Sequence, residues 1–322
     1  MFTLRFDMRA PEWAAPIDDL YAAALEISAW AEKRGAVAAV LSEHHGTADR
    51  HLPSPLVLAA AMAARTRTLP IVVAAAVLPF YEPVRFAEDI AVLDIISQGR
   101  VSIVLGVGHR HEEYEHFGLE LRGRAARADD QLALVLALIR GERVTAAGRS
   151  TRITPAPTSG GPQLYIGGGS LAAARRAGRF GLGLIAQAAT PGLAEAYHEA
   201  CRGAGHEPGF VQIPEAGSAT ALFVAEDVDR AWEELSPHLL HDATTAASYR
   251  HGETWVASIS TATTVDELKT DRAYRVVNVD EATEIVRAGG ILPLLPLCGG
   301  LAPDIAWPYL ERTAEAVARA NR

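Results

Sequence analysis

Short apolar runs alternate with longer segments of helical periodicity along this chain, and this alternation constrains its fold more than any other feature. Runs of four to nine apolar residues indicate buried strands, and apolar residues recurring every three or four positions indicate helices with one buried face. The predicted strands are Thr3–Phe6, Ala38–Leu41, Pro70–Leu78, Val101–Leu105, Gln163–Ile166, Leu182–Ala186, Ala219–Val224 and Ile291–Leu297. The predicted helices are Leu20–Arg34, Pro55–Arg67, Pro83–Ile96, Ala126–Arg140, Leu171–Phe180, Gly192–Arg202, Val228–Leu240, Val279–Ala288 and Pro303–Ala320.

Strands that alternate with crossover helices pair in parallel, so the pattern predicts an α/β fold. Pro55 and Pro83 open two of the helices, where a first turn tolerates a missing N–H. Gly35, Gly99 and Gly141 follow helices, as C-terminal caps do. Eight such units predict a (β/α)8 TIM barrel. The main alternative is an open doubly wound sheet with a small second domain.

The length of the chain exceeds what one barrel needs. A barrel typically takes about 250 residues, and this chain has 322. We therefore predict one barrel domain over residues 1–322, with loop insertions at the C-terminal face. The longest insertion, residues 241–275, has no clear period, and such loops are usually functional or disordered. We interpret it as a candidate lid, with disorder as the alternative.

Composition excludes several classes of protein. The chain carries 30 Lys and Arg against 39 Asp and Glu, a formal charge of −9, which argues against a nucleic-acid or membrane surface. Two cysteines cannot form a disulfide framework. The N-terminus lacks the layout of a signal peptide, and the apolar run near residues 69–80 is too short to span a bilayer. These features favour a cytoplasmic protein.

Polar and glycine residues follow the predicted strands at one end. Because ligands bind at the carboxyl ends of barrel strands, these residues are the first candidates for a site. They are Ser42–His45 after the second strand, Gly106–Glu113 after the fourth, Gly167–Ser170 after the fifth and Gln187 after the sixth.

The run Gly167–Gly169 with Ser170 lies between a strand and a helix. Backbone N–H groups at a helix start favour an anion, and glycine lets the backbone approach a phosphate. The alternative is a tight turn with Ser170 as an N-cap. A dinucleotide fingerprint needs an acidic residue about 20 residues on. The nearest, Glu195, belongs to a later helix, so we discount a nicotinamide site.

The histidines suggest two kinds of chemistry. His111 and His116 are spaced five apart, which turns about 500° on a helix, so their rings do not share a face and we expect no metal site. Glu43-His44-His45 ends a predicted buried strand, where alternation points one of two neighbouring side chains into the mouth. A histidine there can exchange a proton near neutral pH. The alternative is a histidine that bonds to the backbone.

Several motifs together resemble the bacterial luciferase-like monooxygenase family. They are Glu43-His44-His45, then Val77-Leu78-Pro79 with Pro83-Val84-Arg85-x-Ala87-Glu88-Asp89, then Leu93-Asp94-x-x-Ser97-x-Gly99-Arg100, then Gly106-Val107-Gly108 with Glu113 and Phe117-Gly118. The resemblance weakens after these motifs but continues through Gly167–Ser170 into the last helix.

The resemblance implies a barrel that binds reduced FMN, or the deazaflavin coenzyme F-420, at the strand ends. By the same resemblance, His44 matches a histidine that transfers a proton near the flavin. Ala74-Ala75 matches a non-proline cis peptide against the ring, and Gly169 and Ser170 match contacts to the cofactor phosphate. Gln187 falls where a residue reaches the ring. The remaining cofactor-binding candidates are Glu43, Gly106, Gly108 and Gly168.

This sequence also departs from the family's pattern. Gly106 stands where luciferases have a reactive cysteine, and Val107 where a phosphate-binding arginine occurs, so that Arg124 or Arg127 could substitute. His109 replaces the glutamate that follows Gly-x-Gly in deazaflavin sugar dehydrogenases. Gly181-Leu182-Gly183 stands where the family often has Asp-Gly.

Our leading hypothesis is a flavin-dependent oxidoreductase. We expect a two-component monooxygenase that uses reduced FMN and O₂ on a small organic substrate, with a separate flavin reductase as partner. By resemblance to the family, we expect a homodimer. One alternative is a coenzyme F-420-dependent reductase or dehydrogenase on the same fold. Another is a non-catalytic flavin-binding subunit, which the departures at Val107 and Gly181–Gly183 favour.

Overall fold

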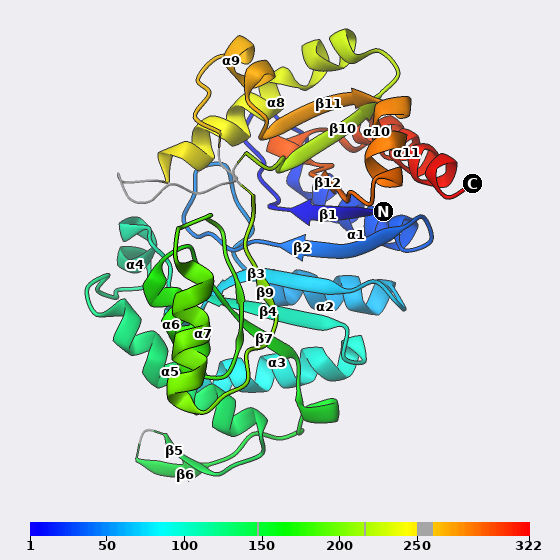
Figure 1. Ribbon diagram of the computed structural model, residues 1–322. Helices are drawn as coiled ribbons and strands as arrows, with labels where there is room; N and C mark the ends of the chain where they lie inside the picture. Colours follow the sequence, from blue (N-terminus) through cyan, green and yellow to red (C-terminus); the bar gives the residue numbers. More distant parts are fainter. Residues whose placement is uncertain (147, 216, 250–259) are drawn as a thin grey trace. The chain divides into compact units, whose positions relative to one another are not determined.

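The computed structural model describes residues 1–322 except 147, 216 and 250–259. The chain divides into two compact units that interleave along the sequence (Figure 1). Unit 1 comprises residues 1–53, 68–70 and 215–322, and unit 2 comprises residues 54–67 and 71–214. The expectation of one domain over residues 1–322 stays a prediction.

Unit 1 is built on parallel strands. Strand β1 lies between β12 and β2 and pairs in parallel with both, while β10 pairs in parallel with β11. Helix α11 packs along β10 (Figure 1). Its elements are β1 (Phe2–Phe6), α1 (Ile17–Ala31), β2 (Ala36–Leu41), β10 (Ala221–Ala225), α8 (Val228–Ser248), α9 (Val265–Thr270), β11 (Tyr274–Asn278), α10 (Val279–Arg287), β12 (Leu292–Leu294), η3 (Cys298–Gly300) and α11 (Pro303–Ala320).

Unit 2 has parallel strands in the order β3-β4-β7-β8-β9 and a short antiparallel hairpin, β5-β6. Helices α6 and α7 lie side by side (Figure 1). Its elements are α2 (Pro55–Arg65), β3 (Ile71–Val77), η1 (Leu78–Phe80), α3 (Pro83–Ser97), β4 (Val101–Gly106), α4 (His111–His116), α5 (Arg124–Ile139), β5 (Val144–Ala146), β6 (Arg149–Thr151), η2 (Thr158–Gly160), β7 (Gln163–Gly167), α6 (Leu171–Arg179), β8 (Gly183–Ile185), α7 (Leu193–Ala204) and β9 (Val211–Gln212).

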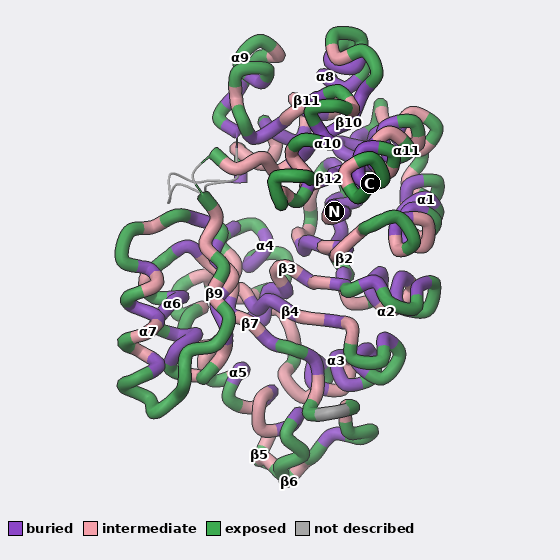
Figure 2. Tube along the Cα trace, turned by 45° about the vertical axis from the view of Figure 1, so that its right-hand side comes forward, coloured by how far each residue is buried: buried purple, intermediate pink, exposed green. Residues whose placement is uncertain are grey.

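Burial follows the periodicity of the sequence. All five residues of β10 are buried, and α5 buries Ala128, Leu132 and Val135 at helical spacing (Figure 2).

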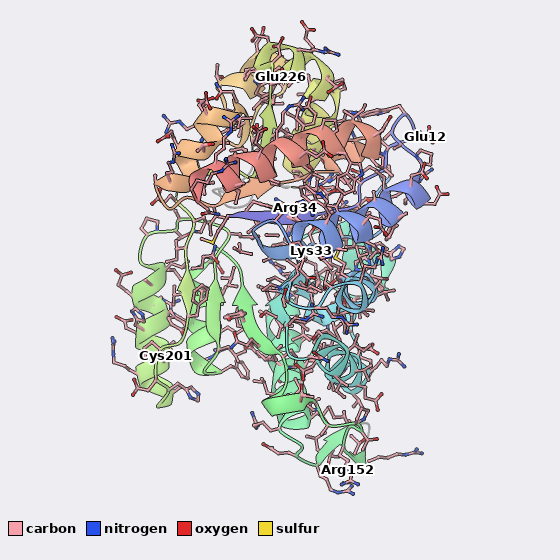
Figure 3. All side chains as sticks on the ribbon, turned by 90° about the vertical axis from the view of Figure 1, so that its right-hand side faces the viewer. Glu12, Lys33, Arg34, Arg152, Cys201 and Glu226 are labelled. Carbon is pink, nitrogen blue, oxygen red and sulfur yellow. The ribbon has the colours of Figure 1, made fainter. Side chains whose placement is uncertain are left out.

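Both cysteines are free and buried, with Cys201 on α7 (Figure 3). No helix in the described ranges combines the length and apolar character needed to cross a bilayer. Each unit therefore has its own apolar interior beneath parallel strands.

The parallel α/β class is confirmed, and each predicted strand and helix has a counterpart in the structure. Sequence patterns missed α4, α9, the β5-β6 hairpin, β9 and β11. The helix predicted to end at Leu240 continues to Ser248, because Asp242 and Ala243 are also buried. Residues 241–275 thus contain the end of α8, all of α9 and the start of β11, so the expectation of a loop without secondary structure is wrong there. Residues 250–259 of the predicted lid lie outside the described residues.

Candidate functional site

Three residues with little or no side chain meet at the carboxyl ends of β3, β4 and β7 in unit 2. Ala75 is an extra residue in β3 where its register with β4 shifts, and the Ala74–Ala75 peptide is cis, as the resemblance implied. A Cβ added to Gly106 would lie 3.3 Å from the Ala75 Cβ, and one added to Gly167 would lie 2.8 Å from Val104 Cγ1 and 3.5 Å from the Ala75 Cβ. All three residues are partly exposed. Together they form a surface, the ring bed, from which no long side chain projects.

The turn after β7 lies next to this ring bed. A Cβ on Gly169 would lie 2.5 Å from the Ala188 Cβ, so only glycine fits there. Thr190 Oγ1 donates to the Gly169 carbonyl at 2.5 Å. Ser170 is the N-cap of α6, and its Oγ accepts from Ala173 N at 3.2 Å. The N-cap interpretation is therefore confirmed, and the start of α6 keeps the partial positive charge that favours an anion.

The arginines on α6 serve the packing of helices. Arg176 is buried and pairs with Asp129 of α5, and its guanidinium also donates to the Ala125 carbonyl at 3.2 Å. Arg179 pairs with the same carboxylate at 2.7 Å. These contacts tie α6 to α5, so they give a structural reason for cations at these positions.

The turn after β4 is fixed by a tyrosine that the sequence analysis did not single out. Gly108 has φ +68°, and a Cβ there would lie 2.8 Å from Val77 Cγ1. The Tyr114 hydroxyl donates to the Val107 carbonyl at 2.5 Å. Burial raises the pKa of Tyr114 to about 12, so the phenol stays protonated and keeps donating at neutral pH. Tyr114 lies on α4 between His111 and His116.

The predicted histidine of unit 1 lies in an aromatic and polar cluster at the end of β2. The His44 ring meets the His51 ring edge-on at 4.7 Å and the Tyr249 ring at 4.9 Å between centroids. His51 Nε2 is 2.9 Å from Ser42 Oγ. The Glu43 side chain is buried, and its Oε1 is 2.8 Å from His45 Nε2. Glu43 and His45 thus share one side of the chain, as alternation requires.

A second group in unit 1, the Arg9 cluster, consists of Arg9, Asp7, Asp49, Asp242 and His241. The Arg9 side chain is 4% exposed, and its guanidinium pairs with three carboxylates: Asp7 at 3.3 Å, Asp49 at 2.9 Å and Asp242 at 3.3 Å. His241 Nε2 lies 3.1 Å from Asp49 Oδ2. Sequence reasoning missed this cluster, although Asp7 and Arg9 directly follow the first predicted strand.

Two carboxyl groups of the Arg9 cluster, Asp7 and Asp49, have pKa values shifted in opposite directions. Burial and the charge of Asp242 raise the pKa of Asp7 to about 6. Burial also acts to raise the pKa of Asp49, but the hydrogen bond from His241 and the charge of Arg9 outweigh it and hold that pKa below its usual range. Tyr274 donates to Asp242 Oδ2 at 2.5 Å, and burial beside that carboxylate raises the pKa of the phenol. One buried cation is therefore shared by carboxyls with different proton affinities.

The histidines and acids of α4 pair with their neighbours. His111 Nδ1 lies 3.2 Å from Glu115 Oε1 on an exposed surface, and Arg110 pairs with the buried Glu113 at 3.1 Å. In the part of the chain that the structure describes, no group of three or more His, Cys, Asp or Glu is arranged to hold a metal ion.

The structure brings most of the predicted cofactor residues together within unit 2. The strands β3, β4, β7 and β8 pair in sequence, so their carboxyl ends are neighbours. The residues there are Ala74, Ala75, Gly106, Gly108, Gly168, Gly169, Ser170 and the exposed Gln187. Glu43 and His44 belong to unit 1. Their roles toward a cofactor stay predictions.

Comparison with known proteins adds a family and a fold. The model of a family described as luciferase-like monooxygenase matches residues 6–286. An F-420-dependent glucose-6-phosphate dehydrogenase from Nocardia farcinica is 31% identical over 173 residues, which cover 50% of this chain and 52% of that protein. The chain spans about half the length of the curated relatives it matches.

Two solved structures extend the likeness to the whole chain. The monooxygenase RslO1 from Streptomyces bottropensis has a TM-score of 0.79 at 20% identity, with all of both chains covered. The oxygenating constituent of 3,6-diketocamphane monooxygenase from Pseudomonas putida, solved with FMN, has a TM-score of 0.72 at 19% identity over 98% of this chain and 97% of that one. At these identities the likeness shows a shared fold.

Proposed function

Because this chain belongs to the luciferase-like monooxygenase family, we propose that it is a cytoplasmic flavin-dependent oxidoreductase, and specifically the oxygenase of a two-component system. It would use reduced FMN and O₂ to oxidise a small organic substrate. The observation that carries this proposal is the ring bed of Ala75, Gly106 and Gly167, where a Cβ added to Gly106 would press on the Ala75 Cβ and one added to Gly167 would clash with Val104 Cγ1. A surface made of two glycines and an alanine leaves room for a planar ring system.

The residues around the ring bed fit the other parts of such a cofactor. Gly168, Gly169 and Ser170 would hold the phosphate at the start of α6, where backbone N–H groups and the helix dipole favour an anion. Gly106, Gly108 and Gln187 would border the ring. Backbone N–H groups would thus bind the phosphate. A chain with an excess of acidic residues therefore needs no cluster of arginines to hold one phosphate group.

The chemistry divides between the cofactor and the protein. When bound, reduced FMN supplies the electrons that activate O₂. The protein orients the ring, excludes water and moves protons. We propose that the His44 imidazole exchanges a proton during turnover, since contacts with the rings of His51 and Tyr249 hold it in place. We also propose Glu43, whose Oε1 is 2.8 Å from His45 Nε2, as a cofactor-binding residue of the same segment.

Two features of architecture complete the proposal. We propose the (β/α)8 barrel that the sequence predicts, as a single domain over residues 1–322. Residues 241–275 would act as a lid that excludes water once substrate is bound.

Binding of cofactors by the purified protein tests the proposal directly. Titration under anaerobic conditions with FMN, reduced FMN and coenzyme F-420 should give tightest binding for reduced FMN. Tighter binding of coenzyme F-420 would favour the reductase or dehydrogenase alternative. Binding of no cofactor contradicts the flavin proposal altogether.

A variant at His44 separates an enzyme from a non-catalytic flavin-binding subunit. His44→Gln should keep the affinity for reduced FMN and lower flavin-dependent oxidation by about 100-fold or more. His111→Gln is the matched control, because His111 is exposed on α4 and pairs only with Glu115 among the contacts described. Unchanged turnover in His44→Gln contradicts the proton-transfer role.

We also propose that the protein is a homodimer that receives reduced flavin from a separate reductase. Helices α2 and α3 expose Val57, Val92, Ile95 and Ile96, and three of these recur on one face of α3. Such exposed apolar clusters commonly mark interfaces. Ile95→Lys should convert a dimer to a monomer in light scattering, whereas Ile291→Lys, at another exposed isoleucine, should not. A monomeric wild-type protein contradicts this proposal.

A further inference from the structure

Two histidines on one face of α8 pack against the same exposed tryptophan. The Trp13 ring lies 5.0 Å from the His238 ring and 5.8 Å from the His241 ring between centroids. Trp13 is 55% exposed, and the His241 side chain is 22% exposed. An indole that remains exposed beside a reachable imidazole offers an apolar face and a titratable group to the same molecule.

The two histidines have different hydrogen-bond partners. His238 Nδ1 lies 2.9 Å from the Gly299 carbonyl, which can only accept, so this nitrogen carries the proton. Burial lowers the pKa of His238, so its ring stays neutral. His241 Nε2 instead lies 3.1 Å from the Asp49 carboxylate. One ring thus supports the backbone of η3, and the other is bound to an anion.

The Asp49 carboxylate fixes the tautomer of His241. The pKa of Asp49 is held below its usual range by His241 and Arg9, so it stays ionised and accepts hydrogen bonds. His241 must therefore donate from Nε2, which leaves Nδ1 as the nitrogen that can take up a proton. Asp49 is itself fixed, since Arg9 holds its Oδ2 at 2.9 Å and Ala10 N donates to its carbonyl at 2.6 Å.

We propose that His241 is a second proton-exchanging residue of this protein, and that Trp13 and His241 together bind a planar aromatic substrate that carries an acidic hydroxyl group. The inference rests on the proposed function, because it assigns the substrate of that enzyme. The aromatic ring packs on Trp13, and the hydroxyl gives its proton to His241 Nδ1. The O–H bond breaks, the oxygen keeps the electron pair and the new N–H forms. The positive charge that the His241 imidazole gains is balanced by the Asp49 carboxylate.

The charged neighbours of His241 are consistent with this role. In the described residues they are Asp49 on the loop after β2, Arg9 after β1 and His238 on its own helix. Asp242 is the next residue along α8, and both Asp242 and Asp7 pair with Arg9. Because the ring is partly exposed, a proton taken from the substrate can pass to solvent.

Binding of 4-nitrophenol tests the inference without any flavin. This probe has a planar ring and an acidic hydroxyl group, and its phenolate absorbs where the phenol does not. At about pH 6, the wild-type protein should bind it as phenolate, and His241→Gln should lower the bound phenolate by about tenfold or more. Gln keeps a donor at the position of Nε2, so the contact with Asp49 is retained.

His238→Asn is the matched control, because Asn keeps a donor at the position of Nδ1 and its ring neighbour Trp13 stays in place. It should give the wild-type phenolate signal. Nitrogen-15 NMR of the histidines provides a second measurement: His241 should carry its proton on Nε2 in the wild-type protein and lose that preference in Asp49→Asn.

The outcomes separate this inference from the proposed function. Equal phenolate binding by wild type and His241→Gln, or no binding of 4-nitrophenol by the wild type, overturns the role of His241 and leaves the flavin titrations unaffected. Phenolate binding in a protein that binds no flavin supports the role of His241 and contradicts the proposed enzyme.

Discussion

The two units carry sites of opposite construction. In unit 2, the candidate site consists of Ala75, Gly106 and Gly167 and a helix start, so backbone and missing side chains define it. In unit 1, the site consists of histidines and of the Arg9 cluster, where one buried guanidinium contacts three carboxylates. The space left by small residues defines the site of unit 2, and ion pairs between charged side chains define the site of unit 1.

This difference teaches where each unit is sensitive to change. A site without side chains loses function when atoms are added, and it has no group that titrates near neutral pH. A buried charge cluster loses stability when one partner is removed, because the others stay buried without compensation. Substitutions and pH should therefore affect the two units differently.

The largest effect is expected for Arg9→Met in unit 1. Removing the guanidinium leaves Asp7, Asp49 and Asp242 buried without their shared cation, so the free energy of unfolding should fall by about 3–5 kcal/mol. Urea unfolding measures it. Arg319→Met is the control, since Arg319 pairs with Asp280 and Glu315 at the surface and should cost at most about 1 kcal/mol. Equal losses in both variants would show that burial of the Arg9 cluster has no energetic consequence.

Next in size is the effect of Gly106→Val on cofactor binding in unit 2. The added side chain would occupy the ring bed beside Ala75, so affinity for reduced FMN should fall by about 100-fold, or about 3 kcal/mol. Equilibrium titration measures it. In the control Gly203→Ala, nothing lies within 4 Å of the added Cβ, and affinity should be unchanged. Wild-type affinity in Gly106→Val would contradict the ring bed.

A smaller effect concerns pH and Asp7. Because the pKa of Asp7 is raised to about 6 from 3.8, folding takes up a proton between about pH 4 and pH 6, and stability falls as pH rises through that window. Asp7→Asn should remove this decline, which is on the order of 2 kcal/mol. Unfolding curves at several pH values measure it.

Asp49 should affect the pH dependence of stability in the opposite direction to Asp7. The pKa of Asp49 is lowered, so its contribution to stability is present above about pH 4 and is lost as pH falls further. Asp49→Asn should therefore be less stable than the wild type at neutral pH. If Asp7→Asn and Asp49→Asn changed the pH dependence of stability in the same direction, the assignment of unequal proton affinities within the Arg9 cluster would be wrong.

The smallest effect is expected at Ser170. Ser170→Ala removes the N-cap of α6 and should cost about 1 kcal/mol of stability. Ser170→Asp keeps a capping carboxylate but repels a phosphate, so it should keep stability and weaken flavin binding. Asn278→Ala, which removes the cap of α10 in unit 1, should lower stability equally and leave flavin binding unchanged. Unweakened binding by Ser170→Asp would place the phosphate elsewhere.

Sequence patterns predicted the elements of both units because strand and helix periods are local. They missed β11, since Tyr274–Asn278 is short and follows a polar segment. The glycines of unit 2 were predictable as candidates because they lie directly after predicted strands. The cis peptide at Ala74–Ala75 came only from resemblance to a family.

The Arg9 cluster was harder to predict for a physical reason. Asp49 is 40 positions from Arg9, and Asp242 is more than 200 positions from it, so no local period connects them. Position after a strand flags Asp7 and Arg9, but burial of charge depends on partners that only the folded chain assembles. His241 fell at the start of a segment expected to be loop, which concealed its place on α8.

The interleaving of the two units has a consequence for synthesis. Unit 2 is complete once residue 214 has left the ribosome, whereas unit 1 needs both ends of the chain. Asp7 and Arg9 are made first, yet Asp242, Tyr274 and Cys298, which surround them, come last. Because non-local contacts form slowly, nascent chains should acquire the scaffold for a cofactor well before the Arg9 cluster assembles. A chain that ends near residue 220 should thus fold into one half with no means of turnover once it has left the ribosome.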